Sequence, residues 1–150
     1  MISCKEMAEI LNWAAVRAKN ELDVPTEVFM EAMAKEAKEW IGFYHPGWAP
    51  LAESTLEGWH GHPGKIELGY APPDNPLLRT GDMRDSIQSQ AELASYGAEG
   101  VIGSESKIAL YQEMGTSKIP PRPFLGGVMS VSGNKAKVVF GEFAVKVLTR

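Results

Sequence analysis

The stretch Pro-Leu-Leu-Arg-Thr-Gly-Asp-Met-Arg-Asp-Ser-Ile at residues 76–87 decides how the second half of this chain folds. Gly81, between Thr and Asp, predicts a tight turn, because glycine adopts backbone angles that other residues resist. Two further blocks follow, Tyr-Gln-Glu-Met-Gly-Thr at 111–116 and Ile-Pro-Pro-Arg-Pro-Phe-Leu-Gly at 119–126. All three blocks are rich in residues that shape the backbone and poor in residues that perform chemistry. We therefore expect a scaffold that binds other proteins.

A period-two pattern follows the turn and predicts a half-buried strand. In residues 87–93, Ile, Ser, Ala and Leu alternate with Gln, Gln and Glu. Residues 96–100 predict a turn and 101–104 a return strand, so that the two strands form a β-hairpin. Residues 108–114 predict a short helix that ends at Gly115. Three prolines then force extended backbone, at positions 120, 121 and 123.

The N-terminal part predicts two helices. Ser3 and Glu6 form a candidate capping box, and apolar residues then recur at helical spacing as far as Asn20. Pro25 opens a second helix that reaches Trp40. Both apolar faces are short, which indicates core packing rather than a coiled coil.

The C-terminal segment carries two conflicting signals. Its Val and Phe content favours a strand, whereas the spacing of its apolar residues favours a helix. We expect a helix over 134–142, capped by Asn134, and leave 143–149 without an assignment.

Residues 42–77 differ from their surroundings because Gly and Pro break every long periodicity. A loop of this length is uncommon inside a compact domain. It is therefore functional, partly disordered, or ordered only against a neighbour. Trp48 and Trp59 make it too apolar for a simple solvated linker, and residues 54–59 predict a short helical turn.

Together these patterns predict an α+β fold in one domain, residues 1–150. N-terminal helices, residues 1–41, pack on a small antiparallel β-sheet. A long mobile loop follows at 42–77, and residues 78–150 supply the sheet and short interspersed helices.

Composition excludes several classes of protein. With 15 Lys and Arg against 19 Asp and Glu, the net charge is −4 and no basic stripe is present, which argues against a protein that grips nucleic-acid phosphates. No run approaches the roughly 18 apolar residues of a membrane span. The N-terminus shows no secretory signal. A single cysteine, Cys4, predicts no internal disulfide and is a poor nucleophile near a free terminus.

Few residues suit catalysis or metal binding. His60 and His62 lie close enough to chelate together, but no Cys pair and no His-Glu-x-x-His helix completes a known zinc pattern. No serine sits in a nucleophile elbow, and no glycine-rich loop suits phosphate. We expect no catalytic residue, no metal and no cofactor. Arg122 offers a planar fork for a carboxylate such as Glu113, and its block serves either as an internal staple or as a partner contact.

Three blocks resemble the tail-completion proteins of tailed bacteriophages, also described as virion morphogenesis, tail terminator or neck proteins. Residues 46–56 resemble the family's Trp-x-Pro-Leu-Ser-x-x-Thr-Leu segment, and 76–87 its Leu-x-x-Thr-Gly-x-Leu-Arg-x-Ser-Ile turn and strand. Residues 111–126 resemble its Tyr-x-x-x-Gly-Thr and Pro-x-Arg-Pro-Phe-Leu signature. Order and approximate spacing agree. The departures are Met83 for Leu, Ala52 for Ser, and a Gly- and His-rich insert at 58–64.

The resemblance implies a structural role without catalysis. Such proteins form a ring, typically of six subunits, that completes the tail and joins it to the head connector. It implies that the partners are the chain itself, the tail-tube protein and head-connector proteins, with DNA passing through unbound and no membrane. It places the protein in the virion tail or neck, after assembly in the host cytoplasm. The motif and interface residues carried over are Trp48, Leu51, Leu56, Thr80, Gly81, Arg84, Ser86, Tyr111, Gly115, Thr116, Arg122, Pro123, Phe124 and Leu125.

Three alternatives remain open from the sequence. One is a head-completion stopper of the neck. Another is a small metal-dependent hydrolase that uses His60, His62 and a carboxylate. The third is a monomeric host-takeover protein encoded by a prophage.

Overall fold

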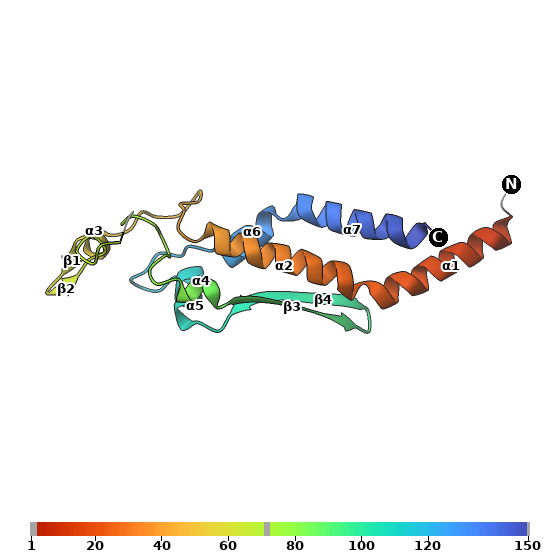
Figure 1. The fold of residues 1–150 in the computed structure, drawn as a ribbon, viewed down its shortest axis with the longest axis horizontal. Coiled ribbons are helices and arrows are strands. Elements are labelled where there is room, and N and C mark those ends of the chain that lie inside the picture. The colour runs from red at the N-terminus through yellow and green to blue at the C-terminus, as the bar shows by residue number, and fades with distance from the viewer. Residues whose placement is uncertain (1–2, 71–72, 150) are drawn as a thin grey trace. The chain divides into compact units, whose positions relative to one another are not determined.

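The computed structural model describes residues 3–70 and 73–149 (Figure 1). In these residues it has seven helices and two antiparallel two-stranded sheets, which confirms the α+β class. The elements in chain order are α1 Cys4–Glu21, α2 Asp23–Trp40, α3 Glu53–Leu56, β1 Gly58–Trp59, β2 His62–Pro63, α4 Asp82–Asp85, β3 Ile87–Ala94, β4 Gly97–Ser104, α5 Lys107–Met114, α6 Leu125–Val131 and α7 Gly133–Leu148.

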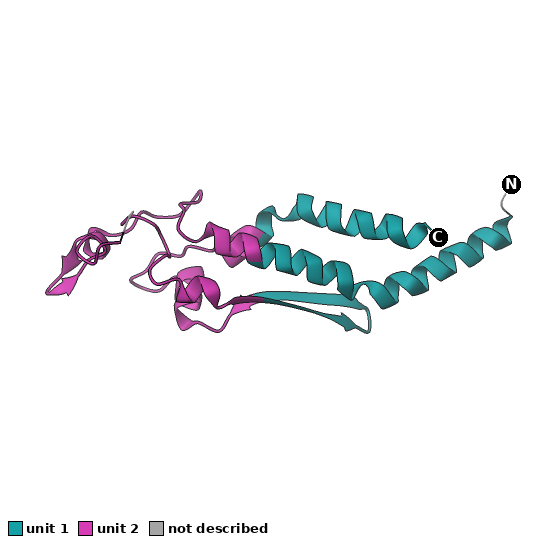
Figure 2. Ribbon diagram, in the orientation of Figure 1, with its two compact units in different colours: residues 1–34, 89–102, 129–150 teal, residues 35–88, 103–128 magenta. Residues whose placement is uncertain are grey.

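The chain divides into two compact units, each assembled from separate stretches (Figure 2). The first unit comprises residues 1–34, 89–102 and 129–150. The second comprises residues 35–88 and 103–128. The expectation of one domain over 1–150 stays a prediction.

The first unit contains the long helices and the outer part of the β3–β4 hairpin. The capping box of α1 is confirmed: Ser3 Oγ accepts from the Glu6 amide at 3.2 Å, and Glu6 Oε2 accepts from the Ser3 amide at 2.8 Å. The α2 and α7 helices contact through Phe29 and Phe140, whose ring centroids lie 5.8 Å apart. Val147 is buried, so the apolar face of α7 continues beyond the predicted stretch.

Two helix starts differ from the prediction. The α2 helix begins at Asp23, because Pro25 is tolerated in a first turn, where its missing N–H is not needed. The predicted Asn134 cap is wrong: α7 begins at Gly133, after Ser132, without any side-chain cap bond. The unassigned residues 143–149 are helical as far as Leu148.

The hairpin was predicted correctly except for its turn. Burial alternates along most of β3, as expected for a half-buried strand. The turn predicted at 96–100 is wrong, because β4 already begins at Gly97. Gly100 lies in the strand, where a Cβ would meet Met30 Cγ at 2.5 Å. Gly100 therefore allows close packing on α2 rather than a chain reversal.

The second unit contains the end of α2, the loop segment, α4 and α5. The long loop at 42–77 is present but carries structure of its own, namely α3 and the small hairpin of β1 and β2. Gly58 pairs with Pro63 and Trp59 with His62. The predicted turn at 54–59 ends earlier, at Leu56, because Gly58 takes a φ of 92° that leaves the helix. Residues 71–72 of this loop lie outside the described residues.

The buried apolar side chains of the second unit come from many short segments: Ala37, Ile41, Pro76, Met83, Ile87, Ala109, Phe124 and Val128. They include Phe124 and Ile87, both essentially inaccessible to solvent. Within 3–70 and 73–149, none of the helices is both long enough and apolar enough to cross a membrane.

Candidate functional site

The three sequence blocks meet in the second unit, where Arg122 connects two of them. Its side chain is only 4% exposed. Nε and Nη2 donate to the Ala49 carbonyl at 3.2 and 3.0 Å, and Nη2 also donates to the Pro50 carbonyl at 3.1 Å. The guanidinium therefore holds the 46–56 block against the 119–126 block. Of the two roles left open for Arg122, this geometry supports the internal staple.

The Glu113 carboxylate caps the start of α6. Its Oε2 accepts from the amides of Phe124 and Leu125 at 2.8 and 2.9 Å, and its Oε1 accepts from Gly126 at 2.8 Å. These amides have no partner within their own helix, so a carboxylate from α5 satisfies them. The predicted Arg122–Glu113 pair is wrong, because backbone groups occupy both side chains.

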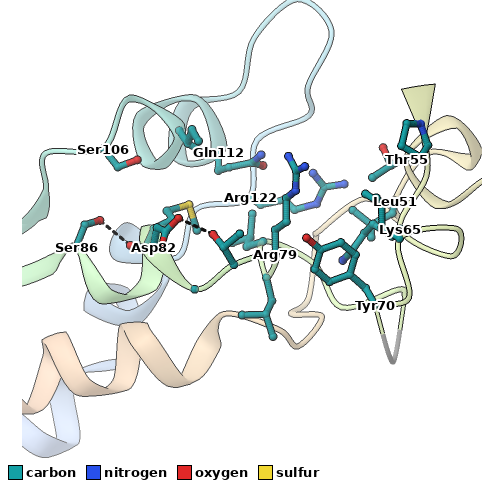
Figure 3. A pocket seen from close by; sticks show the side chains of 18 of the residues that line it. Leu51, Thr55, Lys65, Tyr70, Arg79, Asp82, Ser86, Ser106, Gln112 and Arg122 are labelled. Carbon is teal, nitrogen blue, oxygen red and sulfur yellow. Dashed lines mark hydrogen bonds between the residues drawn. The ribbon is translucent and has the colours of Figure 1, made fainter. Parts of the chain in front are cut away.

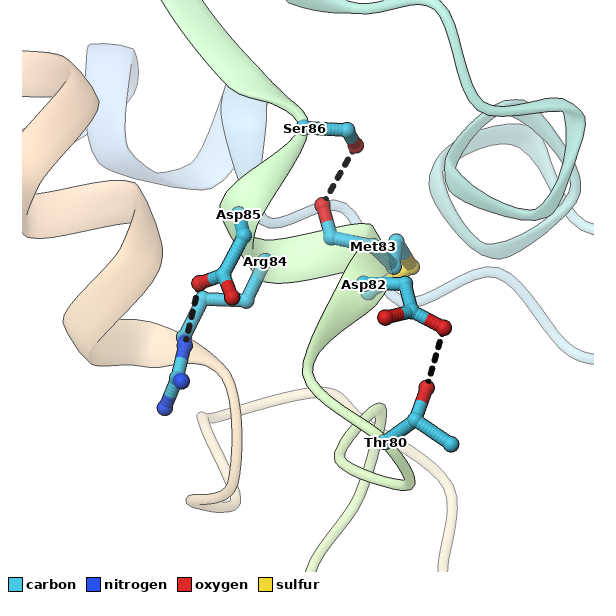
Figure 4. Close-up of polar contacts among 6 residues, drawn as sticks. All are labelled: Thr80, Asp82, Met83, Arg84, Asp85 and Ser86. Carbon is cyan, nitrogen blue, oxygen red and sulfur yellow. Dashed lines mark hydrogen bonds and ion pairs between the residues drawn. The ribbon is translucent and has the colours of Figure 1, made fainter.

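The Thr-Gly-Asp block forms the predicted turn (Figure 4). Gly81 has a φ of 97°, and its carbonyl accepts from the Asp85 amide at 2.9 Å. Thr80 Oγ1 donates to Asp82 Oδ2 at 2.7 Å. Arg84 pairs with its neighbour Asp85 at 3.2 Å, as expected of a surface ion pair. This turn places Met83 in the core.

Two serines tie the hairpin to α5. Ser86 Oγ donates to the Met83 carbonyl at 2.7 Å, as Figure 4 shows, and lies 2.7 Å from Ser104 Oγ on the other strand. Ser104 Oγ also accepts from the Ser106 amide at 3.1 Å, directly before α5. Both serines thus bind the protein's own backbone.

The Gly-Thr pair closes α5. Gly115 has a φ of 74°, which stops the helix as predicted. Thr116 Oγ1 accepts from the amides of Lys118 and Ile119 at 3.2 and 3.0 Å. The Arg122 amide then donates to the Gln112 carbonyl at 2.7 Å. This compact turn brings Arg122 back beside the helix that carries Glu113.

An open groove of about 820 Å³ lies beside these contacts, entirely within the second unit (Figure 3). Its apolar wall comes from the loop segment, α4 and α5. Its charged lining has three cations, Lys65, Arg79 and Arg122, and one carboxylate, Asp82. The apolar residues are Leu51, Leu68, Leu77, Leu78, Met83 and Ile108. A groove of this kind suits an apolar ligand with some negative charge.

One lysine of the groove is perturbed by its surroundings. Partial burial lowers the pKa of Lys65, and the nearby Asp74 carboxylate raises it in opposition. The ammonium donates to the Asn75 carbonyl, which fixes the return of the loop. Lys65 therefore has a structural partner already.

The groove gathers only part of the predicted site. Leu51, Thr80, Gly81, Ser86 and Arg122 line it. Trp48 instead packs edge-on against Trp40 and His45, and its side chain is half-buried. The other predicted residues are not part of the lining: Leu56, Arg84, Tyr111, Gly115, Thr116, Pro123, Phe124 and Leu125.

Several groove residues had no signal in the sequence. The sequence predicts a helix at Ile108 and includes Gln112 in the 111–116 block, but it gives no sign that either side chain lines a groove. Lys65 and Tyr70 lie in the Gly- and Pro-rich loop, where no periodicity in the sequence predicts which way a side chain points. Only the folded loop brings them near α5.

Two of the three histidines pack against aromatic rings. His45 stacks on Trp40 with ring centroids 3.8 Å apart, and His60 lies against Trp59. Across the described part of the chain, no three His, Cys, Asp or Glu side chains come close enough together to hold a metal ion. The hydrolase alternative therefore gains no support from this geometry.

Comparisons with protein-family models, with curated proteins and with solved structures found no match to this chain.

Proposed function

We propose that this chain is a structural, non-catalytic protein of a tailed-phage particle, which completes the tail as a ring of subunits and joins it to the head connector. The observation that carries the proposal is that the three family-like blocks all line one groove, with two of them joined by Arg122. Residues that are scattered over the sequence thus build one local structure.

The hydrogen bonds of that structure support a structural role rather than a catalytic one. The polar side chains of the blocks bind backbone groups: Arg122 holds two carbonyls, Glu113 holds three amides, and Thr116 holds two. A group committed to the backbone is not free to bind a substrate. This pattern supports a scaffold.

The exposed apolar side chains support binding to other proteins. The α5 helix buries only Ala109, while four of its other side chains are large, apolar and exposed: Ile108, Leu110, Tyr111 and Met114. A helix that is apolar on several faces is normally covered by neighbours. This surface therefore supports a role in which subunits or partners cover α5.

The test is assembly of the purified chain. We expect light scattering to show concentration-dependent oligomers and electron microscopy to show rings with a central channel. Added tail tubes should carry these rings at one end. Binding to portal–adaptor complexes without binding to tubes would instead assign a head-completion stopper. A chain that stays single and binds neither partner would contradict the proposal.

Zinc analysis addresses the hydrolase alternative directly. Stoichiometric zinc that is lost in a His60→Ala, His62→Ala double variant would favour that alternative. The same sample serves both experiments.

A further inference from the structure

The β1–β2 hairpin presents a tryptophan on a rigid tip. Its two central residues, His60 and Gly61, have φ values of 47° and 79°, which is the pattern of a type I′ turn. At the base, the Lys65 and Ile66 amides donate to carbonyls of α3 at 3.0 Å each. Trp59 is 67% exposed, although tryptophan is among the most strongly buried side chains on average.

This tryptophan has almost no partner within its own chain. Within residues 3–70 and 73–149, its one ring contact is with the adjacent His60, at 4.1 Å between centroids. Among the residues the structure describes, none accepts a hydrogen bond from its indole N–H. An exposed, rigidly held tryptophan is a typical anchor of protein interfaces.

The groove of the second unit offers what such an anchor needs. Leucines and Met83 give it an apolar wall, and Ile108 at its edge is 60% exposed. Gln112 lies in the lining, and its Oε1 is buried without a hydrogen-bond partner in the described structure (Figure 3). The indole N–H is a donor only, so it matches this acceptor once the amide rotates.

The charges of tip and groove are complementary. Three cations and one carboxylate line the groove, and the Asp74 carboxylate lies near Lys65, so the groove keeps one more cation than carboxylates in a chain whose net charge is −4. Of the cations, Arg79 is exposed and forms no ion pair in the described residues. The tip is flanked by Glu53 and Glu57, and residues 52–64 contain no Lys or Arg. An acidic tip on a basic groove favours this pairing over others.

From these observations we infer that the Trp59 tip of one copy docks into the groove of a second copy. Ser54, Thr55 and Pro63, which lie next to the tip in the sequence, line the groove, but Trp59 itself does not. The Trp59 side chain and the groove are therefore different parts of the surface. The contact is head-to-tail and leaves one tip and one groove open at the ends of each chain of subunits. Closure of such a chain gives a ring. The inference rests on the proposed function, for which it supplies the subunit interface.

Two variants, each with a matched control, test the docking. Trp59→Ala removes the tip, and its control Tyr96→Ala removes another exposed aromatic at a hairpin turn. Ile108→Glu adds a carboxylate at the groove, and its control Val138→Glu adds one to an exposed apolar position of α7, which does not line the groove. We expect each test variant to raise the half-assembly concentration by more than about tenfold, and each control to assemble like the unchanged chain.

A mixing experiment is the sharper test. Trp59→Ala retains its groove and Ile108→Glu retains its tip, so an equimolar mixture contains one functional interface per pair. Analytical ultracentrifugation should show one-to-one dimers in the mixture and single chains in either sample alone. Isologous association would not give this result.

The outcomes separate this inference from the proposed function. If the unchanged chain forms rings and both test variants form them equally well, the docking inference is wrong and the proposed ring-forming function still stands. If the unchanged chain stays single at every concentration, the docking is overturned, and binding to tail tubes then decides the function on its own. Circular dichroism confirms that each variant is folded before either conclusion is drawn.

Discussion

Arg122 and Ala49 lie 73 residues apart in the chain, yet the Arg122 guanidinium donates two hydrogen bonds to the Ala49 carbonyl, at 3.0 and 3.2 Å. A third bond reaches Pro50. A buried arginine is costly unless its donors are satisfied, and backbone carbonyls are acceptors that the loop cannot satisfy by itself. This contact therefore fixes the path of the loop segment that forms one wall of the groove.

Replacing this arginine should destabilise the second unit. For Arg122→Ala we expect the free energy of unfolding to fall by about 2–4 kcal/mol, because a buried side chain is removed and the Ala49 and Pro50 carbonyls lose their charged donor. Arg122→Lys keeps the charge but not the planar fork, so it should recover only part of the loss. Urea denaturation measures both, and Arg79→Ala, on an exposed side chain, should stay within about 0.5 kcal/mol. Equal losses for Arg122→Ala and Arg79→Ala would contradict the inference that Arg122 stabilises the fold through its bonds to Ala49 and Pro50.

Neutralising Glu113 should loosen the start of α6. In Glu113→Gln only one oxygen remains to accept, while the new amide group faces N–H donors. We expect a loss of about 1–3 kcal/mol in the free energy of unfolding and faster hydrogen exchange at the amides of residues 124–126. The control is Glu105→Gln, an exposed carboxylate without a hydrogen bond in the described structure, which should leave that exchange unchanged.

Local patterns in the sequence predicted most of the elements. The capping box at Ser3 and Glu6 and the alternation from Ile87 act within a few residues, so the first helix and β3 formed as expected. The predicted turn at 96–100 is wrong because a glycine can mark either a chain reversal or a place where another element packs closely on the backbone. In β4, Gly100 leaves room for the side chain of Met30, a residue 70 positions earlier, which a Cβ at position 100 would meet.

The groove was not predicted, because its residues meet only through tertiary contacts. The pairing of Arg122 with Glu113 looked natural from their charges. The actual acceptors are carbonyls, which every residue carries and which no sequence pattern identifies. The tryptophan tip likewise depends on positive φ at His60 and Gly61, which the sequence shows only as one glycine after a histidine.

Two glycines should respond to alanine in opposite ways. Gly115 has a φ of 74°, and a Cβ there would lie 2.9 Å from the Ile119 carbonyl and from Pro121. Gly115→Ala should therefore lower the free energy of unfolding by about 1–3 kcal/mol. Gly141 lies inside α7 with open space around it, so Gly141→Ala should raise that free energy by about 0.5–1 kcal/mol. Thermal and urea denaturation of the two variants should show the opposite signs, and a destabilised Gly141→Ala would contradict the open surface of α7.

The capping box should make the first turn of α1 sensitive to acid. Hydrogen bonds from the backbone and the hydroxyl of Ser3 hold the pKa of the Glu6 carboxyl below its ordinary value. Because this pKa is lower in the folded chain than in the unfolded one, ionised Glu6 stabilises the turn above the unfolded value, and the effect is lost as the pH falls through the folded pKa. An NMR titration of the Glu6 carboxyl should show the lowered midpoint. In Ser3→Ala the hydroxyl bond is gone while the backbone bond remains, so the midpoint should move only part of the way back. A midpoint that does not change in Ser3→Ala would show that the hydroxyl does not bind the Glu6 carboxylate.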